Sequence, residues 1–311
     1  MPTLVFFLTA RFTFLARCLV AHQSSMMDGL PYTEAEIKAH CQTHLASVKS
    51  RFDDPEAAFV VLPPKGAGAR YGVKLAGGFQ KPALNYERAF MEFLSSDSKY
   101  YRVPKIYAMF EDERYAYLVM EYLEGPTMWQ VMGEGTTQLS PKDANDIAVA
   151  FLELRNGGKR IQDLQKAGSL TPLEHWDPQG YMFSPDGDGG RILLNQSDFV
   201  SFMTSRFKEA GMDISAISLD EWVLTHGDLT PRNLKRCTDG RIGILDYRTM
   251  FLAPTWWEFY ALHLCGESNF WIGPLKEAMR RQRITAPATL VEALDAKWIP
   301  WFSTRGGAWA R

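Results

Sequence analysis

The chain has 311 residues, of which 46% are hydrophobic and 23% are charged, as is usual for a globular protein with room for two packed lobes. Its 34 Lys and Arg residues nearly balance 36 Asp and Glu residues, so no basic excess indicates nucleic acid or an anionic membrane as a partner. The four cysteines show neither a C-x-x-C pair nor zinc-binding spacing, and we expect free thiols in a reducing compartment.

Residues 1–27 contain no acidic residue, and two readings of them stay open: a non-native extension or a mitochondrial presequence. Arg11 and Arg17 interrupt the apolar stretch, which disfavours a membrane span, and the positive charge follows the apolar residues, which disfavours a secretory signal. We expect no stable membrane span and a cytoplasmic protein, or a mitochondrial one if the segment is a presequence.

Residues 28–122 predict a small N-terminal lobe with an antiparallel sheet. Thr33 followed three residues later by Glu36 is a capping box at the start of a helix. Apolar periodicity and turn residues then predict the remaining elements. In chain order, we expect a helix over 32–48, a hairpin of strands 58–62 and 70–75, a helix over 87–94, and strands over 105–110 and 115–121.

Residues 123–126 read as a hinge, and residues 127–311 as a mainly helical C-terminal lobe. Ser140 followed by Pro141 is a strong helix start, and the apolar pattern continues to Leu154. The Gly-, Pro- and Asp-rich stretch 157–195 predicts a surface insertion. Another helix is expected from a Ser197 cap to Gly211.

The segment from His226 to Asn233 carries the chemistry. Phosphoryl transfer needs a carboxylate to orient the attacking hydroxyl and accept its proton, and it needs oxygen ligands for magnesium near the phosphates. Asp228 and, five residues later, Asn233 supply both kinds of group. A hairpin of 234–235 with 242–245 then returns the chain, so we expect Asp246 to lie beside Asn233.

These residues resemble the signature of the aminoglycoside phosphotransferase and choline kinase-like family, within the protein-kinase-like superfamily. The residues of the motifs resemble those of fungal members more than those of the bacterial resistance enzymes. The resemblance covers roughly residues 55–265, including a hinge-like segment 119–125 and a helix-like segment 254–260. It implies an α+β, protein-kinase-like two-lobed fold, with a small antiparallel sheet in the N-terminal lobe and a helical C-terminal lobe.

The resemblance also implies residue roles for a phosphotransferase that uses ATP and Mg²⁺ and acts on a hydroxyl of a small molecule. Its catalytic residues are Asp228 as base, with His226 and Asn233, and its metal ligands are Asn233 and Asp246. The implied nucleotide-binding residues are Lys74, Glu87 as its partner, and the backbone of Glu121, Tyr122 and Leu123, against which the adenine would lie.

Two departures keep alternatives open. The glycines at 66, 68 and 72 fit a hairpin turn better than a phosphate-binding loop, which favours a non-catalytic nucleotide-binding or scaffold protein on the same fold. Asp246 is followed by Tyr247 and Arg248, and no activation segment follows, which disfavours a protein kinase. The sequence specifies neither the acceptor nor the oligomeric state.

Overall fold

The computed structural model describes residues 29–47, 57–66, 68–94, 98–166, 196–212, 221–264 and 269–298. Their contacts divide the chain into two compact units, the first within 1–84 and 105–122 and the second within 85–104 and 123–311. From Leu123 onward, the chain belongs entirely to the second unit. Residues 1–27, read above as an extension or presequence, lie outside the described residues.

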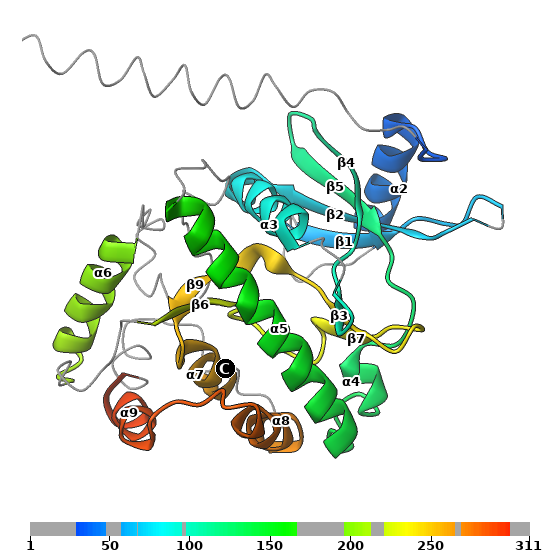
Figure 1. Cartoon of the computed structure of the whole chain (residues 1–311). Helices are drawn as coiled ribbons and strands as arrows, with labels where there is room; N and C mark the ends of the chain where they lie inside the picture. Colours follow the sequence, from blue (N-terminus) through cyan, green and yellow to red (C-terminus); the bar gives the residue numbers. More distant parts are fainter. Residues whose placement is uncertain are drawn as a thin grey trace, which may run out of the picture. The chain divides into compact units, whose positions relative to one another are not determined.

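The first unit is built on an antiparallel sheet. Its strands, in the order β1-β2-β5-β4, are β1 Ala57–Val61, β2 Tyr71–Gly77, β5 Tyr115–Glu121 and β4 Ile106–Glu111. The predicted hairpin is confirmed, since β1 and β2 pair antiparallel from Ala57–Ala76 to Val61–Gly72. Figure 1 shows the helix α2 Glu34–Ser47 beside this sheet.

The capping box predicted for α2 is present. The backbone N–H of Thr33 donates to the carboxylate of Glu36 at 2.8 Å, and the N–H of Glu36 donates to the Thr33 hydroxyl at 3.3 Å. The buried residues Ile37 and Cys41 of α2 then pack into one core with side chains from the sheet, namely Val60, Leu62, Val73, Leu75, Ala108, Tyr115, Tyr117 and Val119.

The helix expected over 87–94 begins earlier. The 3-10 turn η1 Gly78–Gln80 leads directly into α3 Lys81–Leu94. Pro82 suits the first turn of a helix, where a missing N–H costs nothing, and Lys81 anchors this end by donating to the Asp112 carbonyl at 2.7 Å. The C-terminal half of α3 buries the predicted apolar face of Phe90, Met91 and Leu94.

Two small sheets carry the candidate site in the second unit. One has the order β3-β8-β7, with β3 Tyr101–Arg102, β8 Ile242–Ile244 and β7 Leu234–Arg236. The other pairs β6 Trp222–Thr225 antiparallel with β9 Phe251–Pro254. The β7–β8 hairpin confirms the return of the chain predicted before Asp246, whereas the β6–β9 pair was not predicted.

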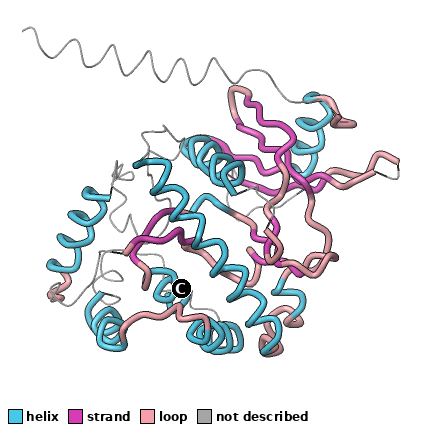
Figure 2. The backbone as a smooth tube through the Cα atoms, viewed as in Figure 1, coloured by secondary structure: helices cyan, strands magenta, loops and turns pink. Residues whose placement is uncertain are grey.

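The other described elements of the second unit that follow Leu123 are mainly helices, drawn in cyan in Figure 2. They are α4 Met128–Val131, α5 Pro141–Lys166, α6 Gln196–Glu209, α7 Trp257–Leu264, α8 Asn269–Arg281 and α9 Ala288–Ala293, with the 3-10 turn η4 Tyr247–Thr249 and the π-helical turn η5 Leu294–Trp298.

The insertion predicted over 157–195 was wrong at its start, because α5 continues to Lys166. A glycine inside a helix costs roughly 1 kcal/mol relative to alanine, which favoured ending the helix at Gly157. Gly157 instead lies against other elements of the unit, where an added Cβ would come within 3.3 Å of the Leu94 side chain. The remainder of the insertion, 167–195, lies outside the described residues.

The helix α6 was predicted at nearly the right place. It begins at Gln196, so Ser197 is inside the helix and does not cap it. Gly211 follows its last turn with a φ of 73°, in the left-handed region where glycine is favoured, as expected for a helix stop.

These elements confirm the expected α+β class, with a small antiparallel sheet in the first unit and helices in the second. Among the described residues, no helix is both long and apolar enough to cross a membrane.

Candidate active site

A tight loop from His226 to Asn233 joins β6 to β7. Its second residue, Gly227, has a φ of 78°, in the left-handed region. An added Cβ at this position would come within 2.7 Å of the carbonyl oxygen of Thr249. The conformation and the close contact both require glycine here, so the backbone can turn sharply and present the next residue, Asp228.

His226 is fully buried and uses both ring nitrogens inside the protein. Its Nδ1 accepts the backbone N–H of Asp228 at 3.3 Å, and its Nε2 lies 2.9 Å from the carbonyl oxygen of Leu245. The neutral tautomer with its proton on Nε2 satisfies both contacts. His226 therefore ties the backbone before Asp246 to the backbone at Asp228, which is a positioning role.

Glu258, on α7, holds the same loop from the other side. Its Oε2 accepts the backbone N–H groups of His226 and Gly227, at 2.5 and 3.0 Å. The side chain is 1% exposed, and burial raises its pKa, while these two hydrogen bonds and the charge of Arg155 oppose the shift. Sequence reasoning gave Glu258 no role, although a single carboxylate between Trp257 and Phe259 is a signal of a buried polar partner.

Asp228 and Asn233 are in direct contact, a hydrogen bond that the sequence did not predict. The Nδ2 of Asn233 donates to Oδ2 of Asp228 at 2.8 Å and to the Asp228 carbonyl at 3.0 Å. Because the amide nitrogen faces Asp228, the Oδ1 of Asn233 is the atom directed away from it. These two hydrogen bonds orient the Asp228 carboxylate.

Asp246 joins this group through the backbone. The N–H of Leu245 donates to the carbonyl of Asn233 at 2.9 Å, and Asp246 follows with a φ of 61° and a ψ of 71°. This left-handed conformation is rare outside glycine and is typical of functional sites. The Oδ1 of Asp246 lies 3.2 Å from Nε of Arg248.

The electrostatics of Asp228 reflect these neighbours. Burial raises the pKa of its carboxyl, and the nearby charge of Asp246 raises it further. The hydrogen bond from Asn233 and the charge of Arg248 lower the same pKa in part. A carboxyl group with a raised pKa is a better proton acceptor than an ordinary aspartate, as a general base requires.

The predicted nucleotide-binding residues are divided between the units. Lys74 lies in the middle of β2, opposite Phe59 of β1 and Leu118 of β5. Glu87 belongs to the second unit, where its buried carboxylate accepts the N–H of Tyr247 at 3.1 Å, one residue beyond Asp246. The pairing of Lys74 with Glu87 stays a prediction.

Backbone groups of the predicted adenine-binding segment are partly engaged. The N–H groups of Glu121 and Tyr122 donate to the carbonyls of Lys105 and Arg70, at 2.8 and 3.2 Å. The Leu123 carbonyl accepts Nζ of Lys235, a buried lysine of β7, at 2.5 Å. Lys235 thus ties the start of the second unit to the strand that follows Asn233, a role that sequence reasoning missed.

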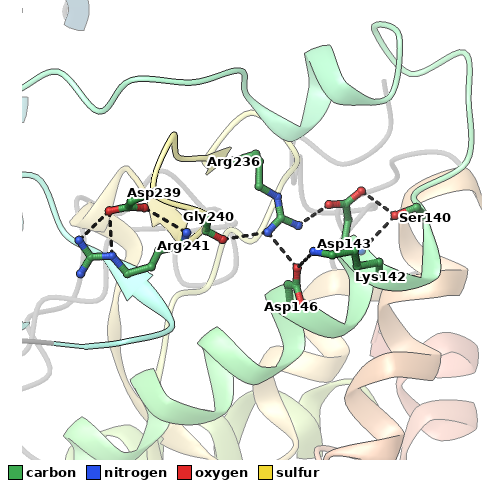
Figure 3. Close-up of polar contacts among 8 residues, drawn as sticks. All are labelled: Ser140, Lys142, Asp143, Asp146, Arg236, Asp239, Gly240 and Arg241. Carbon is green, nitrogen blue, oxygen red and sulfur yellow. Dashed lines mark hydrogen bonds and ion pairs between the residues drawn. The ribbon is translucent and has the colours of Figure 1, made fainter.

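Arg236, next on β7, fixes the hairpin to the start of α5 (Figure 3). Its guanidinium pairs with Asp143 through Nη2 and with Asp146 at 2.9 Å through Nη1, which also donates to the Gly240 carbonyl at 3.1 Å. Desolvation raises the pKa of Asp143, but the hydrogen bonds from Ser140 and Arg236 outweigh it, so the pKa is lowered. The strand that carries the chain from Asn233 toward Asp246 is therefore held in place.

Replacing Arg236 tests this anchor. We expect Arg236→Met to lower the free energy of unfolding by about 1–3 kcal/mol, because Asp143 and Asp146 lose a half-buried partner. Lys142→Met is the matched control, since its exposed pair with Asp146 should contribute at most about 1 kcal/mol. Chemical denaturation of both variants measures the difference, and equal stabilities would contradict the assigned role.

The donor set fits a magnesium ion bound together with phosphates. Among the described residues, no group of three or more His, Cys, Asp and Glu side chains could hold a metal by itself. Magnesium in phosphotransferases commonly takes one or two protein oxygens and completes its shell with phosphate oxygens and water. The outward Oδ1 of Asn233 and the carboxylate of Asp246 are such oxygens.

The chain is similar to known proteins both in sequence family and in structure. The sequence model of the phosphotransferase enzyme family matches residues 57–294. Among solved structures, the streptomycin–ATP ternary complex of APH(2'')-IIa is 16% identical, covers 89% of this chain and 92% of its own, and has a TM-score of 0.47. No curated protein sequence matches.

Two further solved structures are similar at the same level. ADP-bound APH(2'')-Ib, an aminoglycoside phosphotransferase, is 15% identical over 90% of this chain and 92% of its own, with a TM-score of 0.45. A thermostable mutant of APH(4)-Ia in complex with ADP and hygromycin B is 15% identical over 86% of this chain and 88% of its own, with a TM-score of 0.45.

Proposed function

The chain belongs to the phosphotransferase enzyme family, and we propose that it transfers the γ-phosphate of ATP to a hydroxyl group of a small molecule. The observation that carries the proposal is the contact between Asn233 and Asp228. It orients a carboxylate with a raised pKa, and it leaves an amide oxygen for a metal within the same short loop.

In the proposed reaction, Asp228 hydrogen-bonds the acceptor hydroxyl, aligns its oxygen with the γ-phosphorus and takes its proton. As the new P–O bond forms, the bond from the γ-phosphorus to the bridging oxygen breaks and ADP leaves. Asn233 and Asp246 would hold Mg²⁺, which when bound neutralises charge on the phosphates. His226 and Glu258 act on the loop backbone and fix the direction of Asp228. Lys74 is proposed to contact the α- and β-phosphates, with Glu87 as its partner.

The backbone of Glu121, Tyr122 and Leu123 is proposed to contact the adenine. The Leu123 carbonyl is already an acceptor for Lys235, so the neighbouring backbone groups would carry the contacts to the base. The acceptor is a small molecule with a hydroxyl group.

The direct test is ATP consumption against a panel of aminoglycosides, choline, ethanolamine, homoserine and sugars. We expect one class of acceptor to raise the rate of ADP formation well above the rate with water alone, and to gain a phosphate detectable by mass spectrometry. Magnesium-dependent binding of ATP without phosphate transfer to any acceptor would favour the non-catalytic nucleotide-binding alternative.

Lys74→Met tests the proposed phosphate contact. Loss of a preorganised cation beside phosphate oxygens typically costs about 10²–10³ in rate, and we expect that loss in kcat/KM with little change in melting temperature. Lys38→Met is the control, since Lys38 is a lysine of α2 in the same unit whose partly exposed i,i+4 pair is with Glu34. Unchanged ATP kinetics in Lys74→Met would assign the phosphate contact to another residue.

A further inference from the structure

Arg248 is a cation inside the group of catalytic carboxylates. Its Nε lies 3.2 Å from Oδ1 of Asp246, and its charge also acts on Asp228. No role follows for it from the reaction proposed above. Its position beside Asp246 bears on what it does.

The backbone at Arg248 is rigidly held while its side chain is accessible. The preceding Tyr247 is fully buried, donates its N–H to Glu87 at 3.1 Å and its hydroxyl proton to the Ile244 carbonyl at 3.0 Å. The Arg248 side chain, by contrast, is 36% exposed. Because the backbone is anchored and the side chain is partly exposed, the guanidinium can change partners without a movement of the loop.

The pair of Arg248 with Asp246 is partly solvated, since the two side chains are 36% and 21% exposed. Because solvent screens such a pair, the guanidinium can exchange Asp246 for another anion more readily than a fully buried arginine could. Its planar donors match phosphate oxygens, to which arginine can bind through two parallel hydrogen bonds.

Charge balance indicates when the change of partner occurs. Without ligands, Arg248 offsets the negative charge of Asp246. A divalent cation on Asp246 would repel the guanidinium, and the accompanying triphosphate would bring anionic oxygens close to it. The favourable partner of Arg248 is then a phosphate.

We propose that Arg248 is a phosphate-binding residue: it rests on Asp246 in the nucleotide-free protein and moves to the phosphate oxygens when magnesium-bound nucleotide occupies the site. This inference rests on the proposed phosphotransferase function. Arg248 would contribute one contact to the phosphates of the nucleotide. Before the nucleotide binds, it would neutralise the charge of Asp246.

The test is calorimetric titration of wild type, Arg248→Met and Arg248→Lys with three probes: MgATP, adenosine and Mn²⁺ alone. We expect Arg248→Met to weaken MgATP binding about tenfold, as for loss of one charge-assisted contact, and to leave adenosine binding unchanged. Its affinity for Mn²⁺ alone should equal or exceed that of wild type, since a competing cation is gone. Arg248→Lys should recover part of the MgATP affinity.

The controls separate this inference from the proposed function. Thermal melting of the same samples verifies that each variant is folded. MgATP binding in Arg248→Met equal to wild type, or an equal loss for adenosine, would overturn the role of Arg248 while the phosphotransferase assignment stands. Failure of wild type to bind MgATP would overturn the proposed function and this inference together.

Discussion

Asp228→Asn is expected to reduce turnover by about 10²–10⁴-fold, the usual cost of losing a general base. The amide has the size of the carboxylate and can still accept the hydrogen bond that Asn233 now donates at 2.8 Å. It cannot accept the proton of the acceptor hydroxyl. The fold and the affinity for nucleotide should therefore change little, so kcat falls while the Kd for MgATP is retained.

Turnover of Asp228→Asn is measured under saturating ATP with an acceptor found in the panel above. The matched control is Asp239→Asn, an exchange of the same kind in the turn between β7 and β8, where Asp239 pairs with Arg241 and Arg102. Asp239→Asn should keep nearly all of the activity. Comparable activity of Asp228→Asn and wild type would remove Asp228 as the base.

The largest effect on stability is expected for Glu258→Ala. The substitution leaves the N–H groups of His226 and Gly227 without their buried acceptor, and each such loss costs about 1–3 kcal/mol. We expect a decrease of about 2–6 kcal/mol in the free energy of unfolding, a large part of the stability of an ordinary domain. Activity should fall as well, because these N–H groups position Asp228.

Glu258→Gln separates the hydrogen bonds from the charge. One amide oxygen can accept both N–H groups, as Oε2 does now, so this variant should be clearly more stable than Glu258→Ala. Denaturation curves for both variants, with kcat of the folded fraction, measure the two contributions. Equal stability of Glu258→Ala and wild type would show that the loop is held by other contacts.

The candidate catalytic loop could be predicted from the sequence because its residues lie close together in the chain. Asp228 and Asn233 lie five residues apart, and a hairpin of predictable length returns Asp246 to them. The first-unit strands were also predictable, since short apolar runs bounded by turn residues mark them directly. In each case the signal lies within a few residues of the feature that it predicts.

The features that were missed depend on contacts distant in sequence. Glu258 binds backbone groups 31 and 32 residues away, and Lys235 reaches a carbonyl 112 residues away, so neither partner can be read from spacing. The helix α5 passes through Gly157 despite the weak helix propensity of glycine, at a point where an added Cβ would come within 3.3 Å of the Leu94 side chain. Only the folded chain shows which of these opposing preferences prevails.

The most direct test of the central claim is a calorimetric measurement of MgATP binding by Asp228→Asn and Asp246→Ala, with and without magnesium, paired with a measurement of turnover. Asp228 is assigned as the base, and Asp246 as a metal ligand. Asp228→Asn should therefore bind MgATP like wild type without turning it over, and Asp246→Ala should lose both magnesium-dependent binding and turnover. Loss of binding in Asp228→Asn with normal binding in Asp246→Ala would contradict the account.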